Sequence, residues 1–149
     1  MLTTLRKILL VYHYLVGNAF YKLARWGKSS GHYAFVAARL RGNASSIASA
    51  QLFSRQVICY VRIGDTVSAK LACARLTHVI DSVCIASEGD RAWVHDYAQS
   101  LCRCAGIKFP AVSGANAVNY DLVSVAVKRR FPQDDLRALQ ELPISSVSP

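Results

Sequence analysis

The chain has 149 residues, 52% of them hydrophobic, and a formal net charge of +9. This length and hydrophobic content suit one folded domain with a buried core and exclude general disorder. No stretch approaches the roughly 20 uncharged apolar residues that a membrane-spanning helix needs, so we expect a soluble or surface-associated protein.

Charge is distributed unevenly along the chain. Nine of the 18 Lys and Arg residues precede Asp65, whereas all nine Asp and Glu residues fall at or after it. The basic and acidic residues of the second part cancel, so the whole net charge lies in residues 1–64. Such asymmetry predicts a polyanionic partner, an anionic membrane or an address read by an import system.

Residues 2–26 are predicted to form a basic amphipathic helix, because apolar residues recur on one side at helical spacing. Two targeting signals are alternatives. A secretory signal peptide is disfavoured by the lack of a small-residue cleavage pattern. A mitochondrial presequence is better supported by the absence of acids, although the acid-free region runs far past a usual cleavage point. The apolar stripe is Leu5, Leu9, Tyr12, Val16, Phe20 and Leu23, and the opposite side carries Lys7, Asn18, Lys22 and Arg25.

The chain is organised around residues 45–87, which predict an antiparallel helical hairpin. Gly64 can end the first helix in the left-handed conformation, and Asp65 or Thr66 can cap the free amides of the second. So short a connection places the two helices against each other. The second helix, at about residues 65–87, is apolar around most of its circumference, which predicts that it is the central helix of the fold.

The other elements are shorter. Residues 115–131 fit both a helix and a strand, and we favour the helix because a single strand would have no partner. The elements together predict an all-α protein, a single compact domain over residues 1–143 with six or seven helices stacked as antiparallel hairpins. We expect a turn at residues 27–31, helices over residues 32–41, 91–105 and 133–142, and a mobile tail at residues 144–149.

The hairpin junction resembles a known repeat family. The run from Tyr60 to Ala69 is similar to the turn and the second-helix start of tetratricopeptide repeats. The glycine junctions at residues 42, 64 and 89 lie 22 and 25 residues apart rather than the family's period of about 34, and no second copy follows at that period. The resemblance implies stacked helical hairpins and no functional residues.

No arrangement for catalysis or metal binding stands out in the sequence. The chain lacks a P-loop and the GxGxxG, GxSxG and HExxH motifs, so we expect a protein that is not an enzyme and that uses no cofactor. The nearest approach to a metal site is His95 with Cys102 and Cys104, but cysteines two apart on a helix point in different directions. The five cysteines, Cys59, Cys73, Cys84, Cys102 and Cys104, are predicted to be free thiols in a reducing compartment.

The basic residues of the first part predict a nucleic-acid-binding surface, because aromatic residues that could stack on bases lie between them. With no motif for base recognition, phosphate contacts would dominate, to RNA before DNA. The alternative interpretation, which involves no binding, is that these charges are solvated at helix ends and the aromatic residues lie in the core. The predicted nucleic-acid-binding residues are Lys22, Arg25, Lys28, Arg39, Arg41, Arg55 and Arg62.

Other partners remain open at this point. A helical-hairpin adaptor could bind a protein segment or another copy of itself, since so apolar a small chain can leave an exposed patch. The first helix could instead lie on an anionic membrane surface. We expect a cytoplasmic protein, with a mitochondrial location as the alternative suggested by the acid-free N-terminal region.

Overall fold

The computed structural model describes residues 2–40, 47–82, 85, 87–107 and 122–142. Within these ranges the regular structure is entirely helical, which confirms the all-α prediction. The helices are α1 (Leu2–Lys22), α2 (Trp26–Ala37), α3 (Ile47–Ile63), α4 (Thr66–Ser82), α5 (Glu88–Cys104), α6 (Val125–Arg130) and α7 (Gln133–Gln140).

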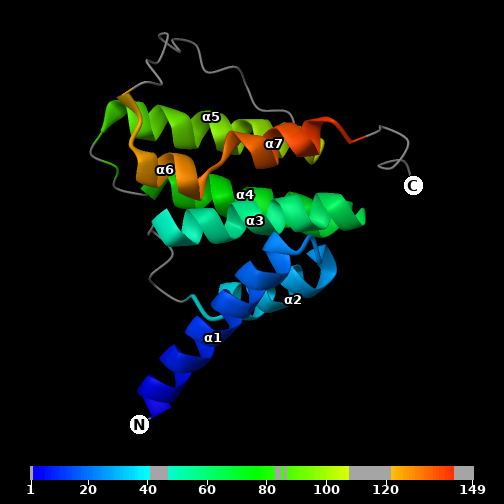
Figure 1. Ribbon diagram of the computed structural model, residues 1–149, viewed down its shortest axis with the longest axis vertical. Helices are drawn as coiled ribbons and strands as arrows, with labels where there is room; N and C mark the ends of the chain where they lie inside the picture. The colour runs from blue at the N-terminus through cyan, green and yellow to red at the C-terminus, as the bar shows by residue number, and fades with distance from the viewer. Residues whose placement is uncertain (1, 41–46, 83–84, 86, 108–121, 143–149) are drawn as a thin grey trace.

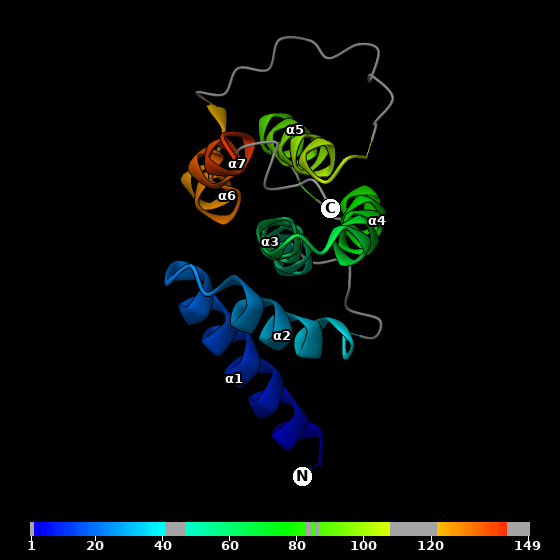
Figure 2. The same ribbon diagram turned by 90° about the vertical axis from the view of Figure 1, so that its right-hand side faces the viewer.

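The helices pack around α3. Figure 2 looks nearly along α3 and shows α2 on one side of it, α4 on another, and α5 with α6 and α7 on the third. The α3–α4 hairpin thus forms the middle of the molecule, with the α1–α2 hairpin below it in Figure 1 and the C-terminal helices above. The first turns of α1 project away from this body.

The α3–α4 connection is built as the sequence predicts. Gly64 has a φ of 77°. The Asp65 amide donates to the carbonyl of Tyr60 at 2.9 Å, and the Gly64 amide donates to that of Val61 at 3.2 Å, which closes the end of α3. The Asp65 carboxylate then accepts a hydrogen bond from the Ser68 amide at 3.1 Å and caps α4.

The central position belongs to α3 and not to the helix expected over residues 65–87. That helix forms as α4 but ends at Ser82, and its Val67 and Leu71 are 81% and 55% exposed. In α3, by contrast, even Gln51 and Gln56 are buried. Among the described helices α4 packs mainly against α3 and α5, so apolar residues around its whole circumference do not imply burial on every side.

The first junction differs from its prediction. Helix α1 ends at Lys22, Ala24 takes a left-handed φ of 56°, and α2 begins at Trp26. Residues 27–31, expected to be a turn, are therefore the first turns of α2. Tertiary contact overrides their weak helix propensity, because the buried Ser29 hydroxyl donates to the carbonyl of Gly17 at 2.8 Å. The helix also ends at Ala37, before the end predicted at Arg41, and the predicted stop at residues 42–43 lies outside the described residues.

The C-terminal helices follow the sequence more closely. Helix α5 starts earlier than expected because Ser87 accepts a bond from the Asp90 amide at 3.4 Å and caps it. It ends at Cys104, and Gly106, two residues further on, has a φ of 86°. The helical interpretation of residues 115–131 is confirmed for α6 at Val125–Arg130, while residues 115–121 and the tail at 144–149 lie outside the described residues.

Close packing of α1 on α2 depends on Gly17, and this gives a stability prediction. A Cβ at Gly17 would lie 2.9 Å from two ring carbons of the buried Tyr33, whereas a Cβ at Gly31 in α2 meets nothing within 4 Å. Both Gly→Ala changes gain about 1 kcal/mol of helix propensity, but the first also overpacks the contact at a cost of about 1–3 kcal/mol. Urea unfolding should therefore rank Gly31→Ala above wild type and Gly17→Ala below Gly31→Ala by about 1–3 kcal/mol. Equal stability of the two variants would contradict the close α1–α2 contact.

Candidate functional site

The second half of α1 packs against the body of the protein through Gly17, Asn18 and the side chains of Tyr14 and Tyr21. The Tyr33 hydroxyl donates to Oδ1 of Asn18 at 2.6 Å, and Arg55 of α3 donates to the same oxygen and to the Tyr33 hydroxyl. Nearer the start of α1, the Tyr14 hydroxyl donates to Oε1 of Gln51 at 3.2 Å. These bonds join α1 to α2 and α3 and fix its rotation about its own axis.

Large apolar side chains of α1 point into solvent on the side away from these contacts. Each residue from Thr3 to Leu9 is exposed, so nothing in the described part of the chain covers the first two turns. Six large apolar side chains are between 45% and 62% exposed, and at 100° per residue they fall within an arc of about 160°. We call them the outer face of α1: Leu5, Ile8, Leu9, Val11, Tyr12 and Leu15.

The outer face overlaps only in part with the stripe expected from the sequence. Leu5, Leu9 and Tyr12 belong to both, whereas Ile8, Val11 and Leu15 were missed. The sequence contains a signal for the missed residues, because residues 8–11 are four consecutive apolar residues, more than one side of a helix can hold. An excess of this kind indicates apolar surface beyond what the fold buries.

Six of the seven predicted nucleic-acid-binding residues lie within the described residues, and they have different surroundings, although Arg62 lies close to Arg25 through its contact with Trp26. Arg55 is half-buried between Asn18, Tyr33 and the ring of Tyr21, where its charge holds the helices together. Arg39 lies over the Phe35 ring at 3.5 Å near the end of α2, and Arg41 is outside the described residues. Arg62 of α3 lies over the Trp26 ring at 5.1 Å.

Three of the seven residues are exposed where α1 passes into α2. We call Lys22, Arg25 and Lys28 the basic corner. Lys28 lies 5.5 Å from the centre of the Phe20 ring, on α1, so the corner is continuous with that helix. Lys22 comes two turns after Leu15 and hence lies on the same side of α1 as the outer face. Apolar surface and the exposed charge of Lys22 thus share one side of α1.

No family model, curated protein or solved structure matches the chain. The resemblance of the Tyr60–Ala69 segment to tetratricopeptide repeats is therefore not supported by a match to a family model.

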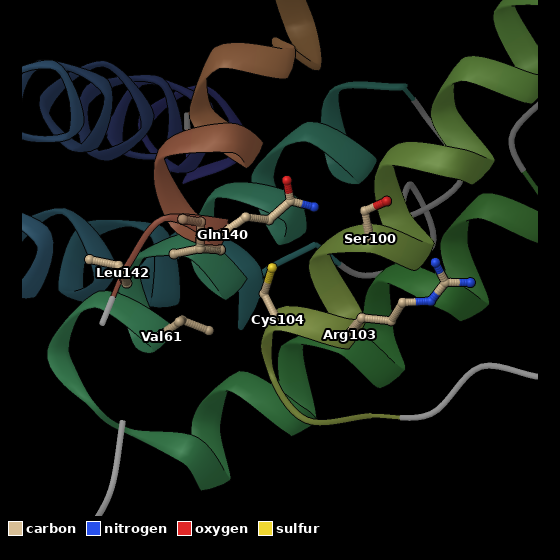
Figure 3. A pocket seen from close by; sticks show the side chains of 7 residues that line it. Val61, Ser100, Arg103, Cys104, Gln140 and Leu142 are labelled. Atoms are coloured by element: carbon tan, nitrogen blue, oxygen red, sulfur yellow. The ribbon is translucent and has the colours of Figure 1, made fainter. Parts of the chain in front are cut away.

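A cavity of about 400 Å³ opens among α3, α5 and α7 (Figure 3). The Cys104 thiol projects into it beside Arg103 and Gln140. Burial, with a smaller contribution from Cys102, raises the pKa of the Cys104 thiol. Among the described residues that line it, none is a histidine or a carboxylate that could deprotonate the thiol. It is lined by Val61, Ser100, Arg103, Cys104, Leu139, Gln140 and Leu142.

In the part of the chain that the structure describes, no three His, Cys, Asp or Glu side chains are grouped as a metal would need. Cys102 hydrogen-bonds with Cys73 of α4, which lowers the pKa of Cys102 and raises that of Cys73.

The helices of the described ranges are too short or too polar to cross a lipid bilayer.

The position of Arg55 gives a second stability prediction. Arg55→Ala would leave Oδ1 of Asn18 and the hydroxyl of Tyr33 without their common donor, and we expect a loss of about 2–3 kcal/mol in the free energy of unfolding. Arg129→Ala, at an exposed position in α6, removes the same charge and should change stability by less than about 0.5 kcal/mol. Chemical denaturation followed by circular dichroism measures both. Equal effects would mean that Arg55 does not hold α1 in place.

Proposed function

We propose that the protein is a non-enzymatic binding protein that docks on an anionic membrane surface through α1. The observation that carries this proposal is the outer face of α1, where six large apolar side chains are exposed on one side of a projecting helix. Helices of this kind lie in the plane of the membrane interface with their apolar face inserted. Tyr12 suits this position because its ring is apolar and its hydroxyl is polar.

Docking in the plane of the interface agrees with how α1 is held. Asn18 and Gly17 face α2 and α3, so in this half of α1 the opposite side is open to a partner, and the first two turns are exposed on all sides. An inserted outer face leaves this packing intact. The folded domain then stays on the aqueous side of the interface.

A lipid surface complements the charge of this region better than a second copy of the chain would. Residues 1–64 contain nine Lys and Arg and no acid, so two copies meeting through α1 would bring like charges together. The outer face is also wider than the narrow seam of a coiled coil. Anionic headgroups instead attract each nearby Lys or Arg by about 1 kcal/mol.

Nucleic-acid binding is the competing proposal. It is supported by the basic corner, whose three exposed charges suit phosphate groups. It leaves the outer face without a role, because phosphate contacts need no apolar surface. The two proposals therefore make opposite predictions about that face.

We propose the cytoplasmic leaflet as the site of docking, since anionic lipids are concentrated there. The thiols of Cys59, Cys73, Cys102 and Cys104 are free, which supports a reducing compartment.

The test is flotation of the purified protein with vesicles of phosphatidylcholine, with and without phosphatidylglycerol. We expect retention on the mixed vesicles and little on phosphatidylcholine alone, with binding reduced but not abolished at high salt, because apolar insertion is not screened. Single-stranded RNA is added in a parallel binding assay. Strong, salt-sensitive RNA binding without vesicle retention would reject membrane docking and select the nucleic-acid proposal.

A further inference from the structure

Two histidines meet where α1 packs on α2. Nδ1 of His13 lies 2.9 Å from Nδ1 of His32. The His13 ring stacks on Phe35 with ring centres 3.9 Å apart, and the His32 ring stacks on Phe20 at 5.6 Å. Both histidines are half-buried. The pair therefore belongs to the contact that holds α1 and its outer face in position.

The pair can hold one added proton readily but not two. Nitrogens 2.9 Å apart form a hydrogen bond in which one donates and the other accepts. A neutral pair and a singly protonated pair both satisfy this bond, whereas two protonated rings would direct N–H groups at each other.

The surroundings oppose further positive charge on the pair. The titratable groups that the structure places around His13 are Tyr12 on α1, His32 on α2 and Arg39 just after the end of α2. None carries a negative charge near neutral pH, and residues 1–64 contain no acid. Burial, followed by the charges of His32 and Arg39, lowers the pKa of His13 below its ordinary value of 6.5.

An anionic lipid surface beside α1 would supply the missing negative charge. Its potential favours the charged form of an imidazole and so opposes the effect of Arg39. A docked state that holds more protons than the free state gains affinity as the pH falls, because proton binding and docking are linked.

We infer that the His13–His32 pair makes docking of α1 on anionic lipid pH-dependent, with mild acid favouring the docked state. This inference rests on the proposed membrane-docking function and names its regulation. Each added proton near the surface should raise the affinity about fivefold.

The experiment measures partition onto phosphatidylcholine–phosphatidylglycerol vesicles at about pH 7.5 and about pH 5.5, the range in which histidine titrates. Phosphatidylglycerol is chosen because its phosphodiester keeps its charge over this range. We expect the affinity of the wild type to rise at least about fivefold at the lower pH. The rise should disappear in the His13→Gln/His32→Gln variant and persist in His78→Gln/His95→Gln, which removes the two histidines on α4 and α5.

A second measurement needs no variant and decides the matter if the first pair of substitutions unfolds the protein. The pKa of the His13 imidazole is followed by NMR in the wild type with and without vesicles, and we expect a higher value with vesicles. Retention that is equal at both pH values, with an unchanged His13 titration, would overturn the inference and leave membrane docking intact. Absence of retention at both pH values would instead reject the docking function itself.

Discussion

The double substitution Ile8→Glu/Leu15→Glu is expected to reduce partition onto phosphatidylglycerol-containing vesicles by at least about 100-fold. Both side chains belong to the outer face of α1 and are about 60% exposed. A buried Leu or Ile contributes about 1.5–3 kcal/mol, so losing two of them from the interface removes about 3–6 kcal/mol if insertion is full. Each new glutamate also meets headgroup charge of its own sign.

The matched control is Val67→Glu/Leu71→Glu on α4. These side chains are equally apolar and 81% and 55% exposed, and the substitutions change the net charge by the same amount. They lie outside α1, so we expect the control to keep most of its vesicle binding. Both variants should fold with nearly unchanged stability, because the substituted side chains are largely in solvent.

The comparison of the two variants separates the classes of partner. Equal loss in both would mean that attraction depends on total charge, and the outer face would have no special role. Undiminished vesicle binding by Ile8→Glu/Leu15→Glu would reject docking through α1. Under the nucleic-acid proposal, both variants would weaken RNA binding only slightly and to a similar extent, since neither alters the basic corner.

Local signals in the sequence predict the helices and their ends well. At Gly64 the left-handed φ and at Asp65 the capping carboxylate depend on residues within one turn, so the residue types alone identify the junction. The same is true of Gly106 at the end of α5. Where tertiary contacts compete with local preference, as for residues 27–31, the prediction fails because Ser29 stabilises the helix through a bond to another helix.

Which side of a helix faces the core is a harder question. For α1, periodicity identifies an apolar side, and packing usually buries such a side. Here Gly17, Asn18, Tyr14 and the buried Tyr21 make the contacts with the rest of the protein, and the side that carries Leu5, Ile8 and Leu15 is left in solvent. Arg55 illustrates the same limit. It is a basic residue that we expected on the surface, but it is half-buried and hydrogen-bonds to Asn18 of α1 and Tyr33 of α2. Neither outcome can be inferred without knowing which helices meet.

The second large expected effect is a loss of vesicle affinity when the charges of the basic corner are reversed. Arg25→Glu/Lys28→Glu reverses two charges of the basic corner, and at about 1 kcal/mol per charge near an anionic surface it should lower vesicle affinity at low salt at least about 30-fold. Arg103→Glu/Arg129→Glu is the control, because it reverses two exposed charges on α5 and α6 within the part of the chain that has no net charge. We expect a much smaller effect from the control, and the difference should shrink as salt screens the headgroup charge.

Binding kinetics of the two double variants would show whether the basic corner and the outer face act at different steps of docking. If docking begins with attraction at the basic corner and is completed by insertion of the outer face, Arg25→Glu/Lys28→Glu should slow association, whereas Ile8→Glu/Leu15→Glu should speed dissociation. Stopped-flow fluorescence of the protein mixed with labelled vesicles measures both rates. Equal loss of affinity in Arg25→Glu/Lys28→Glu and in Arg103→Glu/Arg129→Glu would reject a localised basic corner. Loss of RNA binding alone in Arg25→Glu/Lys28→Glu would assign that corner to nucleic acid rather than to lipid.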